Sequence, residues 1–172
     1  QTTSSGVVQA LLIFKATQIW QVTGDSATSN LLQNYISLTT GCAAPRSVVQ
    51  SPQGVYFAAN SGPMIVDQLG VLRWVVHDAR QTEPDVRAPW AAMATPSRVC
   101  GGYAGSVYRV SMDTVVRGAS VTNDYWFDEQ RRRWNGPHSF AYDCVSQYLT
   151  YSILCSNDFP AELFRSDPAP LT

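Results

Sequence analysis

The sequence predicts an all-β fold built from repeated antiparallel hairpins. Four stretches share one plan, in which an apolar run, a polar turn and a second apolar run follow one another: Leu11–Gly24, Gly54–Asp67, Asn123–Asp143 and Gln147–Asp167. Short apolar runs bounded by Gly, Pro, Asn, Asp and Ser are typical of strands joined by tight turns. The stretches recur at uneven intervals, so they predict hairpins or four-stranded units without a fixed repeat.

The clearest hairpin lies in the third of these stretches. Tyr125–Phe127 is a run of three aromatic residues, which favour strands. Four polar residues then occupy the position of a reversal, and Arg132–Trp134 returns as the second strand. We expect Asn135–Pro137 to stop that strand, because Asn-Gly favours positive φ and proline cannot continue a ladder. The hairpin places Trp126 and Trp134 on neighbouring strands, where an aromatic contact adds about 0.5–1.5 kcal/mol beyond burial.

The remaining segments are predicted from the same signals. Further strands are expected at Ser47–Gln50, Met64–Val66, Val71–Val76, Val107–Val110 and Val115–Arg117. Asn30–Leu38 differs, because its apolar residues lie close to helical spacing and one or two helical turns are possible there. Residues 1–9 are expected to be a flexible entry and residues 166–172 a tail. His77–Thr95 carries both charges and two prolines, and it is expected to be a long excursion with a helical turn at Pro84–Arg87.

The composition is that of a chain with much buried surface. With 172 residues, of which 45% are hydrophobic, residues 1–172 can form a single β domain with an ordinary core. Charged residues make up 15% of the chain, below the usual share of about 25%. Such a chain buries surface in a sheet core or against neighbours, which favours an assembly subunit. The net charge of −1 provides no global field for nucleic acid or an anionic membrane. The sequence also has no apolar run of about eighteen residues that would span a membrane.

The sequence lacks the common catalytic signatures. It contains no nucleophile elbow, no zinc-protease motif, no phosphate loop and no dinucleotide fingerprint. Gly101–Gly105 is rich in glycine but lacks the Lys and Ser/Thr of a phosphate loop, so it is expected to be a turn. We therefore predict a protein that is not an enzyme, with no catalytic residue and no cofactor.

The four cysteines predict no metal site. They are Cys42, Cys100, Cys144 and Cys155, which are far apart and form no C-x-x-C pair. A zinc site normally needs close pairs of ligands. Disulfides are possible because the number is even, but the favoured prediction is four buried thiols that pack as small hydrophobic side chains.

Two stretches carry a resemblance to a known family, the first being Leu11–Gly24 followed by Ser37–Asp67 and the second Asn123–Asp143. Leu11–Gly24 (LLIFKATQIWQVTG) has the pattern of a strand pair. Ser37–Asp67 continues with a glycine, small residues, Ser-Val-Val, an aromatic strand and a return marked by glycine. Asn123–Asp143 adds an aromatic strand, an acidic turn and Arg-Trp. In these stretches the chain resembles the β-propeller tail hub, nozzle and stabilisation proteins of short-tailed bacteriophages.

The resemblance implies propeller-like blades, either partial or completed by assembly, with a β-sandwich as the alternative. It also implies a structural subunit of a tailed-bacteriophage virion, in the tail hub, the nozzle or the head–tail connection. The expected partners are other virion proteins and further copies of the chain, assembled in the bacterial cytoplasm and located in the virion tail. Nucleic acid is expected nearby only if the protein lines a DNA channel. The alternative function is a glycan-binding or sialidase-like module with Trp126, Trp134, Asp128 and Glu129 at the sugar.

Two places combine residue types that are favoured at protein interfaces, namely Trp, Arg and Met. They are Arg80, Arg87, Trp90 and Met93 in the excursion, and Arg131, Arg132 and Arg133 at the edge of the hairpin in Asn123–Asp143. We expect Trp90 to be exposed in the isolated chain and to lose its surface only in the assembly. The alternative is that Trp90 folds back onto its own sheet.

Overall fold

A computed structural model describes residues 10–25, 30–75, 90, 95–116, 119–140, 142–149, 151–156 and 162–166. The described residues form fourteen β-strands and one short 3-10 helix, η1 (Pro96–Arg98). The strands are arranged in four antiparallel sheets, each of which contains three or four strands that follow one another in the sequence. The predicted all-β fold with repeated antiparallel hairpins is therefore confirmed.

The four sheets are numbered here in chain order. Sheet 1 contains β1 (Ala10–Phe14), β2 (Ile19–Asp25) and β3 (Asn30–Ser37). Sheet 2 contains β4 (Ala44–Ser51), β5 (Gly54–Ala59), β6 (Gly62–Asp67) and β7 (Leu72–Trp74). Sheet 3 contains β8 (Cys100–Ala104), β9 (Val107–Val116), β10 (Ala119–Asp128) and β11 (Arg133–His138). Sheet 4 contains β12 (Cys144–Tyr148), β13 (Tyr151–Cys155) and β14 (Leu163–Ser166).

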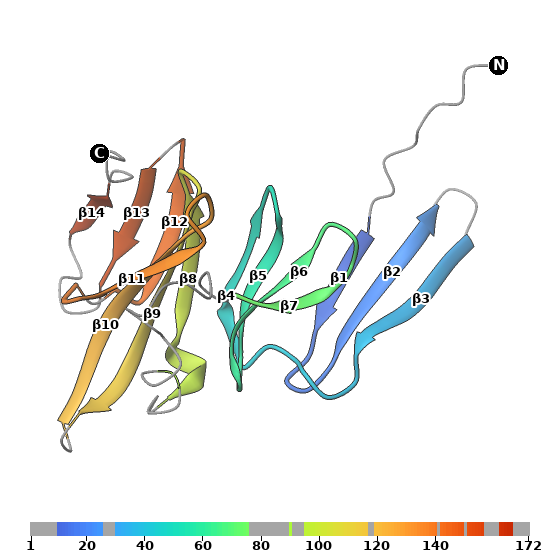
Figure 1. The fold of residues 1–172 in the computed structure, drawn as a ribbon, viewed down its shortest axis with the longest axis horizontal. Helices are drawn as coiled ribbons and strands as arrows, with labels where there is room; N and C mark the ends of the chain where they lie inside the picture. The colour runs from blue at the N-terminus through green and yellow to red at the C-terminus, as the bar shows by residue number, and fades with distance from the viewer. Residues whose placement is uncertain are drawn as a thin grey trace.

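Consecutive sheets pack against one another, and the first strands of sheets 2, 3 and 4 lie next to each other. Figure 1 shows the succession from sheet 1 in blue, through sheet 2 in green, to sheets 3 and 4 in yellow to red. Phe14 contacts Phe57 between sheets 1 and 2, with ring centroids 4.9 Å apart. Tyr56 stacks on Tyr108 between sheets 2 and 3 at 4.5 Å. Each sheet is a meander that buries a face against a neighbouring sheet, an arrangement consistent with propeller-like blades or with a β-sandwich.

Sheet 3 has two chemically different faces because side chains alternate along its strands. The face toward sheet 2 is apolar and aromatic, and it contributes Tyr108, Phe127 and Trp134 to the largest hydrophobic cluster of the described residues. The indole N–H of Trp134 donates a hydrogen bond to the Val75 carbonyl oxygen at 3.1 Å. The face toward sheet 4 carries polar side chains, among them Arg109, which is opposite Trp126 in the β9–β10 register. Sheet 3 therefore packs its main apolar core on the face toward sheet 2.

The hairpin of β10 and β11, which was predicted in Asn123–Asp143, differs from its prediction in two ways. The cross-strand aromatic contact joins Phe127 and Trp134, whose ring centroids are 5.3 Å apart, whereas Trp126 is opposite Asn135 and points to the other face. The second strand also continues to His138 and does not stop at the Asn-Gly-Pro segment. A register shift in the β10–β11 pairing takes up that segment, and proline is tolerated at such irregularities.

Two strand assignments are also corrected. Asn30–Ser37 is strand β3 and not helical, because pairing with β2 satisfies its backbone and outweighs the helical spacing of its apolar residues. Val107–Val110 and Val115–Arg117 were expected to be separate strands. Residues 107–116 form the single strand β9, which pairs with β10 in a continuous register.

The cysteines are not all buried as predicted. Cys42 and Cys100 are buried, but Cys155 is partly exposed and Cys144 is exposed. The difference follows from position, because Cys144 and Cys155 lie on the face of sheet 4 that points away from sheet 3. All four are free thiols in the structure.

Several predictions lie outside the described residues. The flexible entry at residues 1–9, the helical turn at Pro84–Arg87 and residues 167–172 of the tail belong to this group. Of the excursion His77–Thr95, only Trp90 and Thr95 are described. These expectations remain predictions.

Candidate functional site

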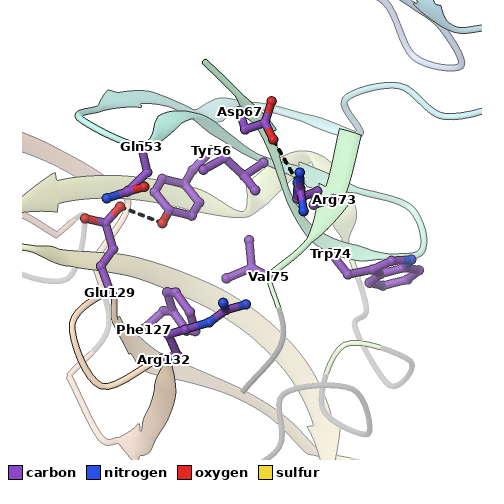
Figure 2. A pocket seen from close by; sticks show the side chains of 10 residues that line it. Gln53, Tyr56, Asp67, Arg73, Trp74, Val75, Phe127, Glu129 and Arg132 are labelled. Carbon is purple, nitrogen blue, oxygen red and sulfur yellow. Dashed lines mark hydrogen bonds and ion pairs between the residues drawn. The ribbon is translucent and has the colours of Figure 1, made fainter. Parts of the chain in front are cut away.

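A pocket of about 410 Å³ opens between sheets 2 and 3. It is lined by Gln53, Tyr56, Ile65, Asp67, Arg73, Trp74, Val75, Phe127, Glu129 and Arg132. Figure 2 shows the hydroxyl of Tyr56 directed at Glu129, and Arg73 directed at Asp67. The Arg73 Nε lies 2.7 Å from an Asp67 carboxylate oxygen, so the charges at this end of the pocket neutralise each other.

Glu129 is held by two tyrosines at the other end of the pocket. The Tyr56 hydroxyl donates to Oε1 at 2.6 Å, and the Tyr103 hydroxyl donates to Oε2 at 2.5 Å. Burial, together with the hydrogen bond and the negative charge of Glu129, raises the pKa of both phenols, so they remain protonated donors. The Glu129 amide also donates to the Ser106 carbonyl oxygen at 3.0 Å. Glu129 therefore links the turn after β10 to sheet 2 and to the β8–β9 turn.

The residues predicted to hold a glycan do not form one site. Trp134 is buried in the core with 1% of its surface exposed. Trp126 lies on the opposite face of the hairpin, where its ring centroid is 4.3 Å from that of His138. Asp128 is also buried, and its Oδ1 accepts hydrogen bonds from the Gln130 and Arg131 amides of the turn. The structure therefore does not bring Trp126, Trp134 and the two carboxylates together on one surface that could bind a sugar.

The Arg131–Arg133 edge is exposed, as its predicted role in an interface requires. Arg131 lies in the turn with its Nε 3.9 Å from Asp128, a contact at the limit of an ion pair. Arg132 lines the pocket and has a positive φ of 50°. Arg133 begins β11. The role of this edge in an interface stays a prediction.

The predicted exposure of Trp90 is wrong. Trp90 has 3% of its surface exposed and belongs to the hydrophobic cluster between sheets 2 and 3. Its indole N–H donates to the Ala59 carbonyl oxygen at 3.1 Å. The structure instead agrees with the alternative, in which Trp90 packs against the chain's own sheets. Arg80, Arg87 and Met93, the other interface candidates of the excursion, lie outside the described residues.

A buried ion pair, which the sequence analysis missed, lies between sheets 3 and 4. The Arg109 Nη2 is 2.5 Å from an Asp124 carboxylate oxygen, and both side chains are almost completely buried. The Tyr142 hydroxyl donates to the other Asp124 oxygen at 2.7 Å, and the Trp126 indole N–H also donates to this carboxylate. Burial raises the pKa of the Asp124 carboxyl, and the Arg109 guanidinium acts against that rise. The Arg109 guanidinium lies over the rings of Trp126 and Tyr142.

Among the described residues, sheet 1 has the largest group of exposed apolar side chains of the four sheets. By register, Leu11, Ile13, Trp20, Val22, Leu31 and Tyr35 share the face that points away from sheet 2, and we call it the outer face. Leu11 and Tyr35 are each 62% exposed and Leu31 is 57% exposed. The opposite face carries Leu12, Phe14 and Ile19, which pack against sheet 2. Among the described residues, both faces of sheet 1 therefore carry large apolar side chains, and only the face with Leu12, Phe14 and Ile19 packs against another sheet.

The sequence contained the signal for this surface. In β1, the run ALLIF is apolar at every position and does not alternate between apolar and polar residues. Continuous apolar runs are typical of strands that are buried on both faces. This signal indicates a covered strand but not the molecule that covers it.

The described residues contain no group of three or more His, Cys, Asp or Glu side chains that could hold a metal ion. Among the same residues, no helix is long and apolar enough to cross a membrane. Comparison with known proteins finds no family model and no curated protein that matches the chain.

Proposed function

We propose that the chain is a structural subunit of a tailed-bacteriophage virion that acts through protein–protein contacts and not by catalysis. The observation that carries this proposal is the outer face of sheet 1, which is apolar, exposed and built like the faces that pack together inside the chain. Contiguous exposed apolar patches with polar surroundings mark interaction sites. The outer face also includes Trp20 and Tyr35, which contact each other edge to face at 6.1 Å, and both residue types are favoured at interfaces.

The energetic argument concerns the side chains of the outer face. Complete burial of one large aliphatic side chain contributes about 1.5–3 kcal/mol. Leu11, Ile13 and Leu31 would gain part of this free energy when a second apolar sheet covers them. The gain offsets the loss of translational and rotational freedom on association, which costs about 4–15 kcal/mol. Association is therefore favourable only if the partner buries most side chains of the outer face at once. Consecutive sheets of the chain bury their facing side chains in this way.

The resemblance to phage tail proteins supports a place in the virion tail, at the hub, the nozzle or the head–tail connection. The proposed partners are further copies of the chain and other virion proteins, after assembly in the bacterial cytoplasm. The pocket between sheets 2 and 3 supports a structural role, because Glu129 and Asp67 are each engaged by neighbouring side chains. These interactions engage both carboxylates with neighbouring strands and turns.

Substitution of Leu31 by lysine tests the proposal. We expect Leu31→Lys to weaken self-association at least about tenfold, because a charge replaces an apolar side chain whose burial is worth about 1.5–3 kcal/mol. The thermal midpoint should change little, since Leu31 is 57% exposed in the isolated chain. Sedimentation velocity over a concentration series measures the association constant.

Leu69→Lys is the matched control, because Leu69 is 85% exposed in the turn between β6 and β7, away from the outer face. It should associate like the unmodified chain. Equal weakening by both substitutions would remove the outer face from the interface. A chain that remains monomeric at high concentration would overturn self-association. Specific binding on a glycan array, or turnover of a glycoside, would favour the glycan alternative over the structural role.

A further inference from the structure

Two cysteines lie directly opposite each other at the outer side of sheet 4. The β12–β13 register pairs Cys144 with Cys155 and continues without a shift to Tyr148 and Tyr151. Residues that are directly opposite on antiparallel strands have Cα atoms about 4.5–5.5 Å apart, and disulfides need Cα atoms about 4.4–6.8 Å apart. The Cys155 thiol is also close enough to Cys144 to raise the pKa of the Cys144 thiol. The register therefore holds the two cysteines at a Cα separation that a disulfide accepts.

The same pair is accessible to reagents in solution. Cys144 is exposed and Cys155 is partly exposed, and the next residue across the sheet from Cys155, Leu163 of β14, is 73% exposed. Burial and the neighbouring Cys155 raise the pKa of the Cys144 thiol, so its reaction should be faster at mildly alkaline pH, where more thiolate forms.

The other two cysteines provide an internal contrast. The thiol of Cys42 donates to the Ala44 carbonyl oxygen at 3.1 Å, and the thiol of Cys100 donates to the Tyr142 carbonyl oxygen at 3.3 Å. Both are buried, and burial raises the pKa of Cys100 to about 12. These thiols pack in the interior as small hydrophobic groups.

We propose that Cys144 and Cys155 are the site of an intramolecular disulfide that joins β12 to β13. The oxidant is a small-molecule disulfide such as oxidised glutathione. One cysteine thiolate attacks it, forms a mixed disulfide and releases one glutathione thiolate; the second cysteine thiolate then displaces the other glutathione. The two cysteines lose two electrons and two protons in total, and oxidised glutathione becomes two glutathione thiols. In a reducing cytoplasm the pair stays as thiols, and it closes when the chain meets an oxidising environment.

The disulfide would link the strands of the β12–β13 hairpin. This hairpin belongs to sheet 4, the last sheet in the described part of the chain. Sheet 4 has three strands and is covered by sheet 3 on one face. A covalent link between β12 and β13 lies on the other face and prevents these strands from separating. The proposal does not depend on the proposed function, because it concerns the chemistry of one hairpin.

Thiol counting after oxidation tests this proposal. The full chain is incubated with oxidised glutathione at mildly alkaline pH, denatured, and alkylated with iodoacetamide without a reductant. We expect two alkylated cysteines and a peptide pair linked through Cys144 and Cys155 in the mass spectrum. Reduction before alkylation should restore all four labels.

Variants identify the pair. Cys144→Ser and Cys155→Ser should each abolish the intramolecular link and leave the remaining exposed thiol as a glutathione adduct. A variant with both Cys42→Ser and Cys100→Ser should form the link as the unmodified chain does. Four alkylated cysteines after prolonged oxidation, or a link that includes Cys42 or Cys100, would overturn the proposal.

Discussion

Replacing Trp90 by alanine is expected to lower the free energy of unfolding by about 3–5 kcal/mol. The indole has 3% of its surface exposed and fills space within the cluster between sheets 2 and 3. The substitution removes its packing contacts and leaves a cavity that the surrounding strands can close only in part. It also leaves the Ala59 carbonyl oxygen without the hydrogen bond from the indole N–H. Urea unfolding followed by far-ultraviolet circular dichroism measures the change.

Trp74→Ala is the matched control for this substitution. Trp74 ends β7 and is 44% exposed, so the same truncation should cost clearly less. If Trp90→Ala unfolds no more easily than Trp74→Ala, the burial of Trp90 does not stabilise the chain. An effect on association without any loss of stability would instead support the expectation that Trp90 is an interface residue.

Replacing Asp124 by alanine is expected to cost about 3–5 kcal/mol, because one partner of a buried ion pair is removed. The Arg109 guanidinium would then be buried without its carboxylate, and the Tyr142 hydroxyl and Trp126 indole would lose their acceptor. Desolvation of an unpaired charge dominates this cost. Chemical unfolding at neutral pH measures it.

Two further variants separate the ion pair from general effects of substitution. Arg73→Ala removes a cation that is paired with Asp67 at the surface, and it should cost at most about 1 kcal/mol. A double variant, Arg109→Met with Asp124→Leu, removes both charges together. It should recover much of the stability lost by Asp124→Ala, because replacing a buried ion pair by apolar side chains is often neutral. A double variant as unstable as Asp124→Ala would show that the hydrogen bonds, and not the unpaired charge, account for the loss.

The strands and most of the hairpins could be predicted because their signals are local. The turn at Lys15–Thr17, for example, separates two apolar runs that form β1 and β2. The predicted hairpin stretch Gly54–Asp67 forms β5 and β6, since glycine marks its start and Asn60-Ser61 separates the two strands. Asn30–Ser37 could not be assigned in this way, because its backbone pairs with β2 and only that partner excludes a helix.

The buried ion pair of Arg109 and Asp124 was harder to predict, because its position depends on which faces of the sheets meet. Residues within the run of Asn123–Asp128 point to opposite faces of β10, so Asp124 and Trp126 face Arg109 while Phe127 faces Trp134. Local sequence shows this alternation but not which layer lies on which side. The ion pair of Arg109 and Asp124 thus appeared as two ordinary polar residues in a strand.

The sequence by itself determined the class of the fold, because strand and turn preferences act over a few neighbouring residues. It also contained the continuous apolar run of β1, which places apolar side chains on both faces of sheet 1. Only the tertiary structure decided that Trp90 is buried, that Cys144 is opposite Cys155, and that Leu11, Leu31 and Tyr35 on the outer face of sheet 1 are exposed. The physical reason is that register and burial depend on contacts between strands, which bring together residues that the sequence keeps apart.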